Sequence, residues 1–201
     1  MEGLTDEQLL ALWANTEAAR DRREQAFREL VDRYERRVWA ICRRIVGSDA
    51  DAEEATQDTF IRIARSGATF RGDSKLSTWI HRVATSACQD LLRKRARRPQ
   101  TPVEDIAMVA AAAGLDEAPD DSGSSAAVDA VARALASLDD VSRSIVVLCA
   151  IEGFEYREAA DALSMPVGTV KSRLFRARAH LADLLADEIG REHLGPTRRP
   201  T

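Results

Sequence analysis

The sequence predicts an all-α fold of two small helical domains joined by a flexible acidic linker. Apolar residues recur at spacings of three and four in both halves of the chain, and no alternating run is long enough for a convincing strand. From Pro99 to Ala127 the chain instead holds six acids, no Lys or Arg, and the turn-rich run Pro119–Ser125. We therefore place a linker at 99–125, between a first domain at 1–98 and a second at 126–189. A plain spacer is the alternative reading of the linker.

Four helices are expected in the first domain. The first opens at Thr5–Gln8, which has the form of a capping box. The second runs from about Arg23 to Val46 and stops at Gly47, a residue typical of helix ends. A third lies between Asp49 and Ala64, and the fourth, at about Ser77–Arg97, carries apolar pairs every four residues. The domain ends in five cations within six residues: Arg93, Lys94, Arg95, Arg97 and Arg98.

The second domain is expected to pack four shorter helices, at about Ala126–Leu135, Asp139–Ile151, Tyr156–Leu163 and Val167–Asp187. Each is too short to be stable alone, so their apolar faces must pack on one another. The last helix carries an apolar stripe at spacings of three and four, formed by Val167, Val170, Leu174, Ala177, Leu181 and Leu184. The tail at 190–201, which contains two prolines, is predicted to be disordered.

Composition and charge exclude several classes of protein. The chain has 201 residues, 45% hydrophobic and 31% charged, with a net charge of -4, which excludes a wholly disordered or collagen-like chain. No stretch approaches the ~18 apolar residues of a membrane span, and the N-terminus lacks a basic region followed by an apolar one, so we expect a cytoplasmic protein. Cys42, Cys88 and Cys149 have no metal-ligand spacing and are interpreted as buried thiols. We expect no metal and no cofactor.

The last two predicted helices form a helix-turn-helix. Only Ser164, Met165 and Pro166 separate them, and the second carries four cations with no acid before Asp183. In such a motif the second helix lies in the DNA major groove. The residues predicted to meet bases or phosphates are Thr169, Lys171, Ser172, Arg173 and Arg176. A solvated basic face on a structural helical hairpin is the alternative.

Several stretches resemble the extracytoplasmic-function sigma factors, which are promoter-specificity subunits of bacterial RNA polymerase. Glu152–Ala160 and Val167–Arg178 look like the family's promoter-reading domain 4. Asp51–Phe60 is similar to its polymerase-binding helix, and Phe70–Ala84, with further polar residues beyond, resembles its promoter-melting segment. The resemblance covers residues 23–98 and 126–185.

The resemblance implies a role for each matched stretch of the first domain. The helix matching Asp51–Ala64 is expected to dock on the coiled coil of the polymerase beta-prime subunit through Asp51, Glu54, Gln57 and Asp58, whose acids suit a basic partner. The alternative is a solvated face with an Asp58–Arg62 pair. The minus-ten element is expected to meet Arg71, Ser74, Lys75, Trp79, Arg82, Gln89, Arg93 and Lys94, where an unstacked base is captured. Trp79 also fits a core position beside Val83.

The chain departs from the family pattern at three positions. Ser86 stands where the family commonly has Asn, and Ala64 replaces a frequent aromatic residue at the end of the polymerase-binding helix. Ser164 occupies the turn position that usually holds Gly. A left-handed conformation there would cost about 1 kcal/mol.

These observations predict a sigma factor that binds core RNA polymerase, through its beta-prime and beta subunits, and promoter DNA. Family habit implies an anti-sigma factor, and membrane contact is expected only through a membrane-anchored form of that partner. No catalytic residues are expected, because His81, His180 and His193 are isolated and no glycine-rich phosphate loop is present. The alternatives are a stand-alone helix-turn-helix regulator and, with less support, an interaction protein or nucleic-acid enzyme. The acidic linker is a candidate for shielding the basic segments from DNA.

Overall fold

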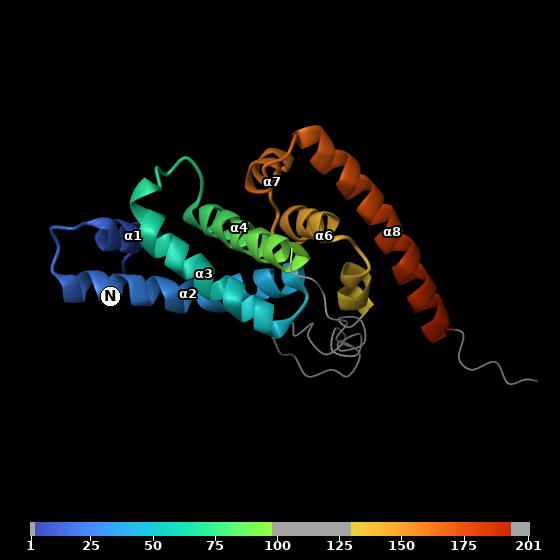
Figure 1. Cartoon of the computed structure of the whole chain (residues 1–201), viewed down its shortest axis with the longest axis horizontal. Coiled ribbons are helices and arrows are strands. Elements are labelled where there is room, and N and C mark those ends of the chain that lie inside the picture. Colours follow the sequence, from blue (N-terminus) through green and yellow to red (C-terminus); the bar gives the residue numbers. More distant parts are fainter. Residues whose placement is uncertain (1–2, 98–129, 194–201) are drawn as a thin grey trace, which may run out of the picture. The chain divides into compact units, whose positions relative to one another are not determined.

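The described residues are 3–97 and 130–193 of the computed structural model, with side chains of the last helix as far as residue 186. All regular elements within these two ranges are helices, which confirms the predicted all-α class (Figure 1). The chain divides into two compact units, considered separately below. The predicted linker at 99–125 and most of the predicted tail lie outside the described residues.

The first unit contains α1 (Asp6–Ala14), α2 (Arg20–Val46), α3 (Asp49–Ser66), the short 3-10 helix η1 (Gly67–Thr69) and α4 (Leu76–Arg97). The three long helices α2, α3 and α4 all pack against one another. The short α1 packs on α2 and on η1, and in Figure 1 it lies beside the end of α3. Each predicted helix is present, and α2 and α3 are slightly longer than expected.

Local signals in the sequence account for the helix ends. The Thr5 hydroxyl accepts from the Gln8 backbone N–H at 3.3 Å while the Gln8 side chain accepts from the Thr5 N–H at 2.8 Å, which completes the predicted capping box. At the end of α2, Gly47 has φ 84°, a left-handed conformation that costs glycine little. The next residue, Ser48, caps the start of α3.

The core of the first unit is apolar with a few buried polar residues. Cys42 and Cys88 are fully buried, as predicted. On α3, Thr59 is fully buried, and its hydroxyl donates to the Ala55 carbonyl at 2.6 Å. Burial, together with the charge of Arg37, lowers the pKa of His81 to about 4, so this histidine is a neutral core residue at neutral pH.

The second unit contains a helix over 130–136, then α6 (Asp140–Val146), η3 (Val147–Ile151), α7 (Tyr156–Ala162) and α8 (Val167–His193). The single helix predicted over Asp139–Ile151 changes to π geometry at η3. The Glu152 N–H bonds to the Val147 carbonyl at 2.9 Å and the Phe154 N–H to the Leu148 carbonyl at 2.9 Å, so the chain widens before it turns.

The end of the last helix and one cysteine differ from expectation. The helix α8 continues to His193, beyond the predicted end at Asp187 and into the stretch expected to be disordered. Cys149, predicted to be buried, is only half-buried because it lies on the widened turn of η3.

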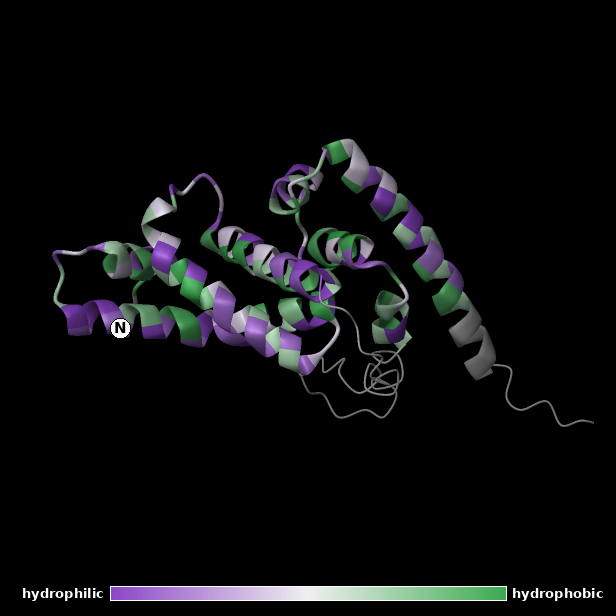
Figure 2. Ribbon diagram, in the orientation of Figure 1, coloured by the Kyte–Doolittle hydropathy of each residue, from purple (hydrophilic) through white to green (hydrophobic). Residues whose placement is uncertain are grey.

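The apolar stripe of α8 packs on α6 in the second unit. Val170, Leu174 and Ala177 are buried, whereas Val167, Leu181 and Leu184 are half-buried. Figure 2 shows hydrophobic and hydrophilic residues alternating along α8, as expected for an amphipathic helix. None of the helices in the described part of the chain combines the length and apolar character that a membrane crossing needs.

Candidate nucleic-acid interface

The predicted acidic surface lies on one side of α3. Asp51, Glu54 and Asp58 follow one another at spacings of three and four, which places them on one helix face, and Gln57 adjoins them. Glu54 and Gln57 are exposed, whereas Asp58 is half-buried and the Asp51 side chain is only 18% exposed. The four predicted side chains are therefore not equally available to a partner.

Two of these acids form ion pairs with the end of α4. The Lys94 ammonium lies 3.0 Å from Glu54 Oε1, and the Arg95 guanidinium pairs with Asp51. Sequence reasoning assigned Asp51 and Glu54 to a polymerase surface and Lys94 to a DNA surface, and it assigned Arg95 to neither. The structure brings the two sets together in these ion pairs.

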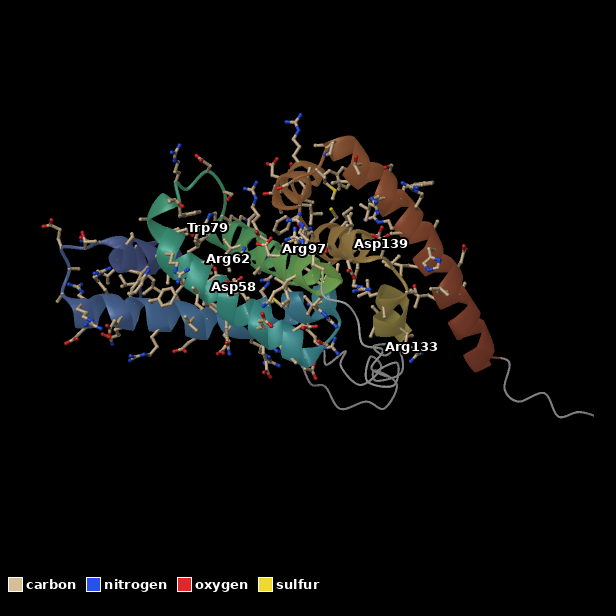
Figure 3. The ribbon with its side chains drawn as sticks, viewed as in Figure 1. Asp58, Arg62, Trp79, Arg97, Arg133 and Asp139 are labelled. Atoms are coloured by element: carbon tan, nitrogen blue, oxygen red, sulfur yellow. The ribbon has the colours of Figure 1, made fainter. Side chains whose placement is uncertain are left out.

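Arg62 is the centre of a second group of charges between α3 and α4. Its guanidinium lies 2.7 Å from Asp58 and 2.9 Å from Asp90, and it donates to the Ser86 hydroxyl at 3.2 Å. Burial acts to lower the pKa of Arg62, but the two carboxylates outweigh it and raise that pKa. Figure 3 shows Asp58 and Arg62 on α3. Asp58 and Ser86 thus both bind Arg62 within the first unit. The sequence indicated only the pairing of Asp58 with Arg62, through their spacing of four.

The loop between η1 and α4 is mostly exposed. Arg71 and Lys75 extend into solvent, Ser74 is half-buried, and Gly72 has φ 79°, the left-handed conformation that favours glycine. Just beyond the loop, Trp79 is half-buried and pairs with Phe70, with ring centroids 5.6 Å apart and planes at 55° (Figure 3). The indole therefore closes the base of the loop.

The polar face of α4 continues from this loop. Arg82, Ser86, Gln89 and Arg93 recur at spacings of four, three and four, so they share one face of the helix. Arg93 is exposed, while Arg82 and Gln89 are half-buried. The Arg93 guanidinium lies 3.4 Å from Asp90, a long contact that leaves it available to an anion.

The turn between α7 and α8 contains Ser164, which stands where the family usually has Gly. Ser164 adopts φ 51°, a left-handed conformation. A non-glycine residue there costs about 1 kcal/mol, which the buried Leu163 and the start of α8 must offset. The N–H groups of Thr169 and Val170 both bond to the Pro166 carbonyl, at 2.9 and 3.2 Å, which begins α8 directly after the turn.

The outward face of α8 carries exposed cations and one exposed aromatic residue. Lys171, Ser172 and Arg176 are exposed, Thr169 is half-buried, and Phe175 is 77% exposed. The Lys171 ammonium lies 5.7 Å from the centre of the Tyr156 ring on α7. Sequence reasoning did not select Phe175 as a contact residue. The available signal was its position between Arg173 and Arg176 and outside the apolar stripe. No carboxylate among the described residues pairs with Lys171 or Arg176.

Arg173 differs from its neighbours on α8 because its side chain is directed toward α6. Its guanidinium lies 3.2 Å from Asp139 Oδ1 and 3.4 Å from the Ser142 hydroxyl. Burial acts to raise the pKa of Asp139, but hydrogen bonds from Ser142 and the charge of Arg173 lower it. Asp139, labelled in Figure 3, also caps α6, so Arg173 ties the start of α6 to α8.

Two family models match the two units. Sigma-70 region 2 matches residues 30–98, and Sigma-70, region 4 matches residues 129–181. These matches define the class of protein, a sigma-70-type chain with one region in each compact unit.

Curated relatives give the particular family. The chain is 36% identical over 160 residues to the ECF RNA polymerase sigma factor SigM of Mycobacterium tuberculosis strain H37Rv, covering 80% of this chain and 77% of that protein. It is 32% identical over 186 residues to the ECF RNA polymerase sigma-E factor of Haemophilus influenzae, covering 88% and 93%. The chain belongs to the ECF RNA polymerase sigma factors, and it functions as a sigma factor in the initiation of transcription.

Solved structures agree with this assignment. CnrH, in a complex with the cytosolic domain of CnrY, is 27% identical with a TM-score of 0.60, over 90% of this chain and 97% of that one. The sigma factor RpoE of Bartonella quintana, solved with the anti-sigma factor NepR, shares the fold at 22% identity and a TM-score of 0.59, over 80% and 96%.

Proposed function

We propose that this sigma factor recognises two promoter elements, one with each unit, while α3 binds core RNA polymerase. Residues 1–98 act as sigma domain 2, which binds polymerase and reads and melts the minus-ten element, and residues 126–189 act as sigma domain 4, which reads the minus-thirty-five element. The observation that carries this proposal is the match of regions 2 and 4, in that order, to two separate compact units. A stand-alone regulator is not favoured, because it gives no reason for a region 2 match.

The contact to the minus-thirty-five element is assigned to the start of α8. Lys171 and Arg176 are exposed cations of α8, suited to guanine O6 and N7 or to phosphates, and Thr169 and Ser172 supply hydroxyl donors. Arg173 also belongs to the proposed surface, but its main role is to orient α8, because its guanidinium pairs with Asp139. Phe175 adds an exposed apolar surface that fits a thymine methyl group.

The contact to the minus-ten element is assigned to the loop before α4 and the polar face of that helix. Arg71, Ser74 and Lys75 surround the loop tip, where an extruded base must be held by polar groups to offset the cost of unstacking. Trp79 closes the base of the loop. The remaining contacts are assigned to residues spread along α4, namely Arg82, Gln89, Arg93 and Lys94.

The contact to core polymerase is assigned to the exposed side of α3. Glu54 and Gln57 are exposed, and Asp51 and Asp58 contribute negative charge from beside them. The expected partners are the beta-prime and beta subunits, and the chain itself performs no catalysis. Bacterial transcription takes place in the cytoplasm, so we place the protein in that compartment.

An anti-sigma factor is a further proposed partner. The solved relatives CnrH and RpoE were captured with CnrY and with the anti-sigma factor NepR, respectively. Any membrane contact of this chain would pass through such a partner.

Transcription in vitro from a library of random promoters tests the proposed function. With core enzyme added, the chain should enrich transcripts whose templates share two sequence elements at a fixed spacing, and core enzyme alone should enrich none. Electrophoretic mobility shifts on the enriched promoter provide the control, because binding should require core enzyme. Tight and specific binding by the free chain, without polymerase-dependent transcription, would instead identify a stand-alone regulator.

A further inference from the structure

The loop that we assign to the minus-ten element, residues 70–75, does little to hold its own position. Arg71, Gly72, Asp73 and Lys75 are exposed. Among the described residues, its side chains make one hydrogen bond, from the Ser74 hydroxyl to the Lys75 carbonyl at 3.4 Å. The elements at the two ends of the loop must therefore set where its side chains stand.

One end of the loop is anchored within α4. Phe70 packs on Trp79, and Leu76, at the start of α4, is 1% exposed. The other end is η1, whose Gly67 carbonyl accepts from the Phe70 N–H at 3.2 Å. This hydrogen bond means that the position of η1 directly sets the position of Phe70, the first residue of the loop.

The helix η1 rests on α1. Gly67 is buried, and a Cβ atom at this residue would lie 2.8 Å from Leu10 Cδ1 and 3.6 Å from Trp13 Cδ1. Leu10 is itself 2% exposed, so it has little room to move away. The side chains of α1 therefore define how closely η1 approaches the unit.

Trp13 also holds the end of α3, from which η1 continues. Its indole N–H donates to the Ala64 carbonyl at 3.0 Å, in the last turn of α3, where carbonyls lack partners within the helix. The ring is held in turn by Phe27, with centroids 4.7 Å apart, and by Arg23, whose guanidinium lies 5.3 Å from the ring centre and donates to the Trp13 carbonyl at 3.0 Å.

The start of α1 is bonded to α2, so α1 is not a loose support. Asp6 accepts from the Tyr34 hydroxyl at 2.6 Å and from the Arg33 guanidinium at 2.8 Å. Burial acts to raise the pKa of Asp6, but these two hydrogen bonds lower it, so the carboxylate stays charged at neutral pH. Both ends of α1 are thereby joined to the unit.

We propose that α1 is a positioning element for minus-ten recognition, with Trp13 as its principal positioning residue. Leu10 and Trp13 hold the junction of α3 and η1 and, through it, the loop that carries Arg71 and Lys75. The helix α1 precedes the region 2 match, which begins at residue 30. This inference rests on the proposed function, because it names what orients the proposed minus-ten loop.

The test uses holoenzyme reconstituted from core polymerase and the full chain. Open-complex formation is measured on an enriched promoter and on the same promoter with one substituted minus-ten base, and the ratio of the two is the discrimination. Trp13→Phe keeps an aromatic ring on Phe27 and removes the N–H donor. We expect it to lower the discrimination about five-fold, the effect of losing one hydrogen bond at an anchoring point.

Trp39→Phe is the matched control. Trp39 lies on α2, and within the described part of the chain its indole makes no hydrogen bond to α3 or η1. This variant should leave the discrimination unchanged. If Trp13→Phe instead lowered open-complex formation equally on both promoters, or changed only the melting temperature, Trp13 would be merely structural and the inference would be overturned.

Gly67→Ala supplies a second measurement from the other side of the same contact. The added methyl group should push η1 away from Leu10 and lower the discrimination, and Leu10→Val, which removes the crowding Cδ1 atom, should restore much of it in the double variant. Additive losses in the double variant would count against the inference. A wild-type holoenzyme that ignores the minus-ten base would overturn the proposed function and this inference together, whereas intact wild-type discrimination that Trp13→Phe does not change overturns this inference alone.

Discussion

The end of α4 in the first unit and the outward face of α8 in the second present their cations in opposite ways. In the first unit, Lys94 and Arg95 are paired with acids of α3. In the second, Lys171 and Arg176 have no carboxylate partner among the described residues, and the one paired cation of the same face, Arg173, binds Asp139. The comparison teaches that a basic residue count does not measure readiness to bind DNA, because an internal acid competes with phosphate for the same cation.

The difference has a physical consequence for partner binding. Glu54 faces the proposed polymerase surface and also neutralises Lys94 of the proposed minus-ten surface. We expect a basic partner that engages Glu54 to weaken its hold on Lys94, so the proposed binding of polymerase and the proposed binding of DNA would be coupled through this pair. Within the described ranges no acid pairs with Lys171, so we expect α8 to meet a phosphate without first breaking an ion pair there.

The largest expected effect concerns the uncompensated cations of the second unit. Lys171→Ala combined with Arg176→Ala should lower minus-thirty-five-dependent promoter binding by holoenzyme about 100-fold, since each base or phosphate contact contributes about 1–3 kcal/mol. Titration of labelled promoter with holoenzyme measures this loss. Arg22→Ala with Arg28→Ala, which removes two exposed cations of α2, is the matched control. Loss of core-polymerase binding in the Lys171 and Arg176 variant would show that α8 is wrongly assigned.

A smaller effect is expected from the compensated cation of the same helix. Arg173→Ala should lower the free energy of unfolding by about 1 kcal/mol or less, because its ion pair with Asp139 is partly exposed while its hydrogen bond to Ser142 is partly buried. Thermal unfolding followed by circular dichroism measures this change. Promoter affinity should fall much less than with Lys171→Ala. An equal fall in affinity with unchanged stability would place Arg173 on the DNA rather than on α6.

The smallest expected effect concerns the paired charges of the first unit. Glu54→Gln releases Lys94, and because an exposed pair contributes about 0.2–1 kcal/mol, affinity of the chain for a single-stranded minus-ten oligonucleotide should rise about two- to three-fold. Association with core polymerase should weaken. Fluorescence anisotropy and pull-down measure the two quantities. Glu53→Gln, exposed on the same helix without a described ion pair, should change neither, and a fall in oligonucleotide affinity with Glu54→Gln would refute the coupling.

Local features of the fold were predictable, and several details of the candidate site were not. The capping box at Thr5, the stop at Gly47 and the turn at Ser164 all depend on residues within a few positions of one another, and each is present. The widening of η3 was not predicted, because the apolar pattern over Asp139–Ile151 does not distinguish a short π-helix from a continuing α-helix.

The candidate site likewise has features that the sequence predicted and features that it did not. The spacing of Lys171 and Arg176 on one helix was enough to predict a basic face. No spacing in the sequence showed that Arg173 reaches Asp139, that Arg62, expected beside Asp58, also reaches Asp90, or that Trp13 bonds to Ala64. In these cases the partners lie from 28 to more than 50 positions apart or on different helices, and side-chain direction is set by packing.

The sequence by itself determined where the helices form, the ends marked by caps and glycines, the order of the two sigma-factor regions and the sign of each charged block, because periodicity, capping and motif spacing are local properties. Tertiary structure alone decided which charges are neutralised and what supports the minus-ten loop. Long side chains such as Lys94 and Arg62 choose among several nearby acids only after α3 and α4 are packed. For the same reason the role of α1 became visible only when Trp13 and Ala64, distant in the chain, were seen in contact.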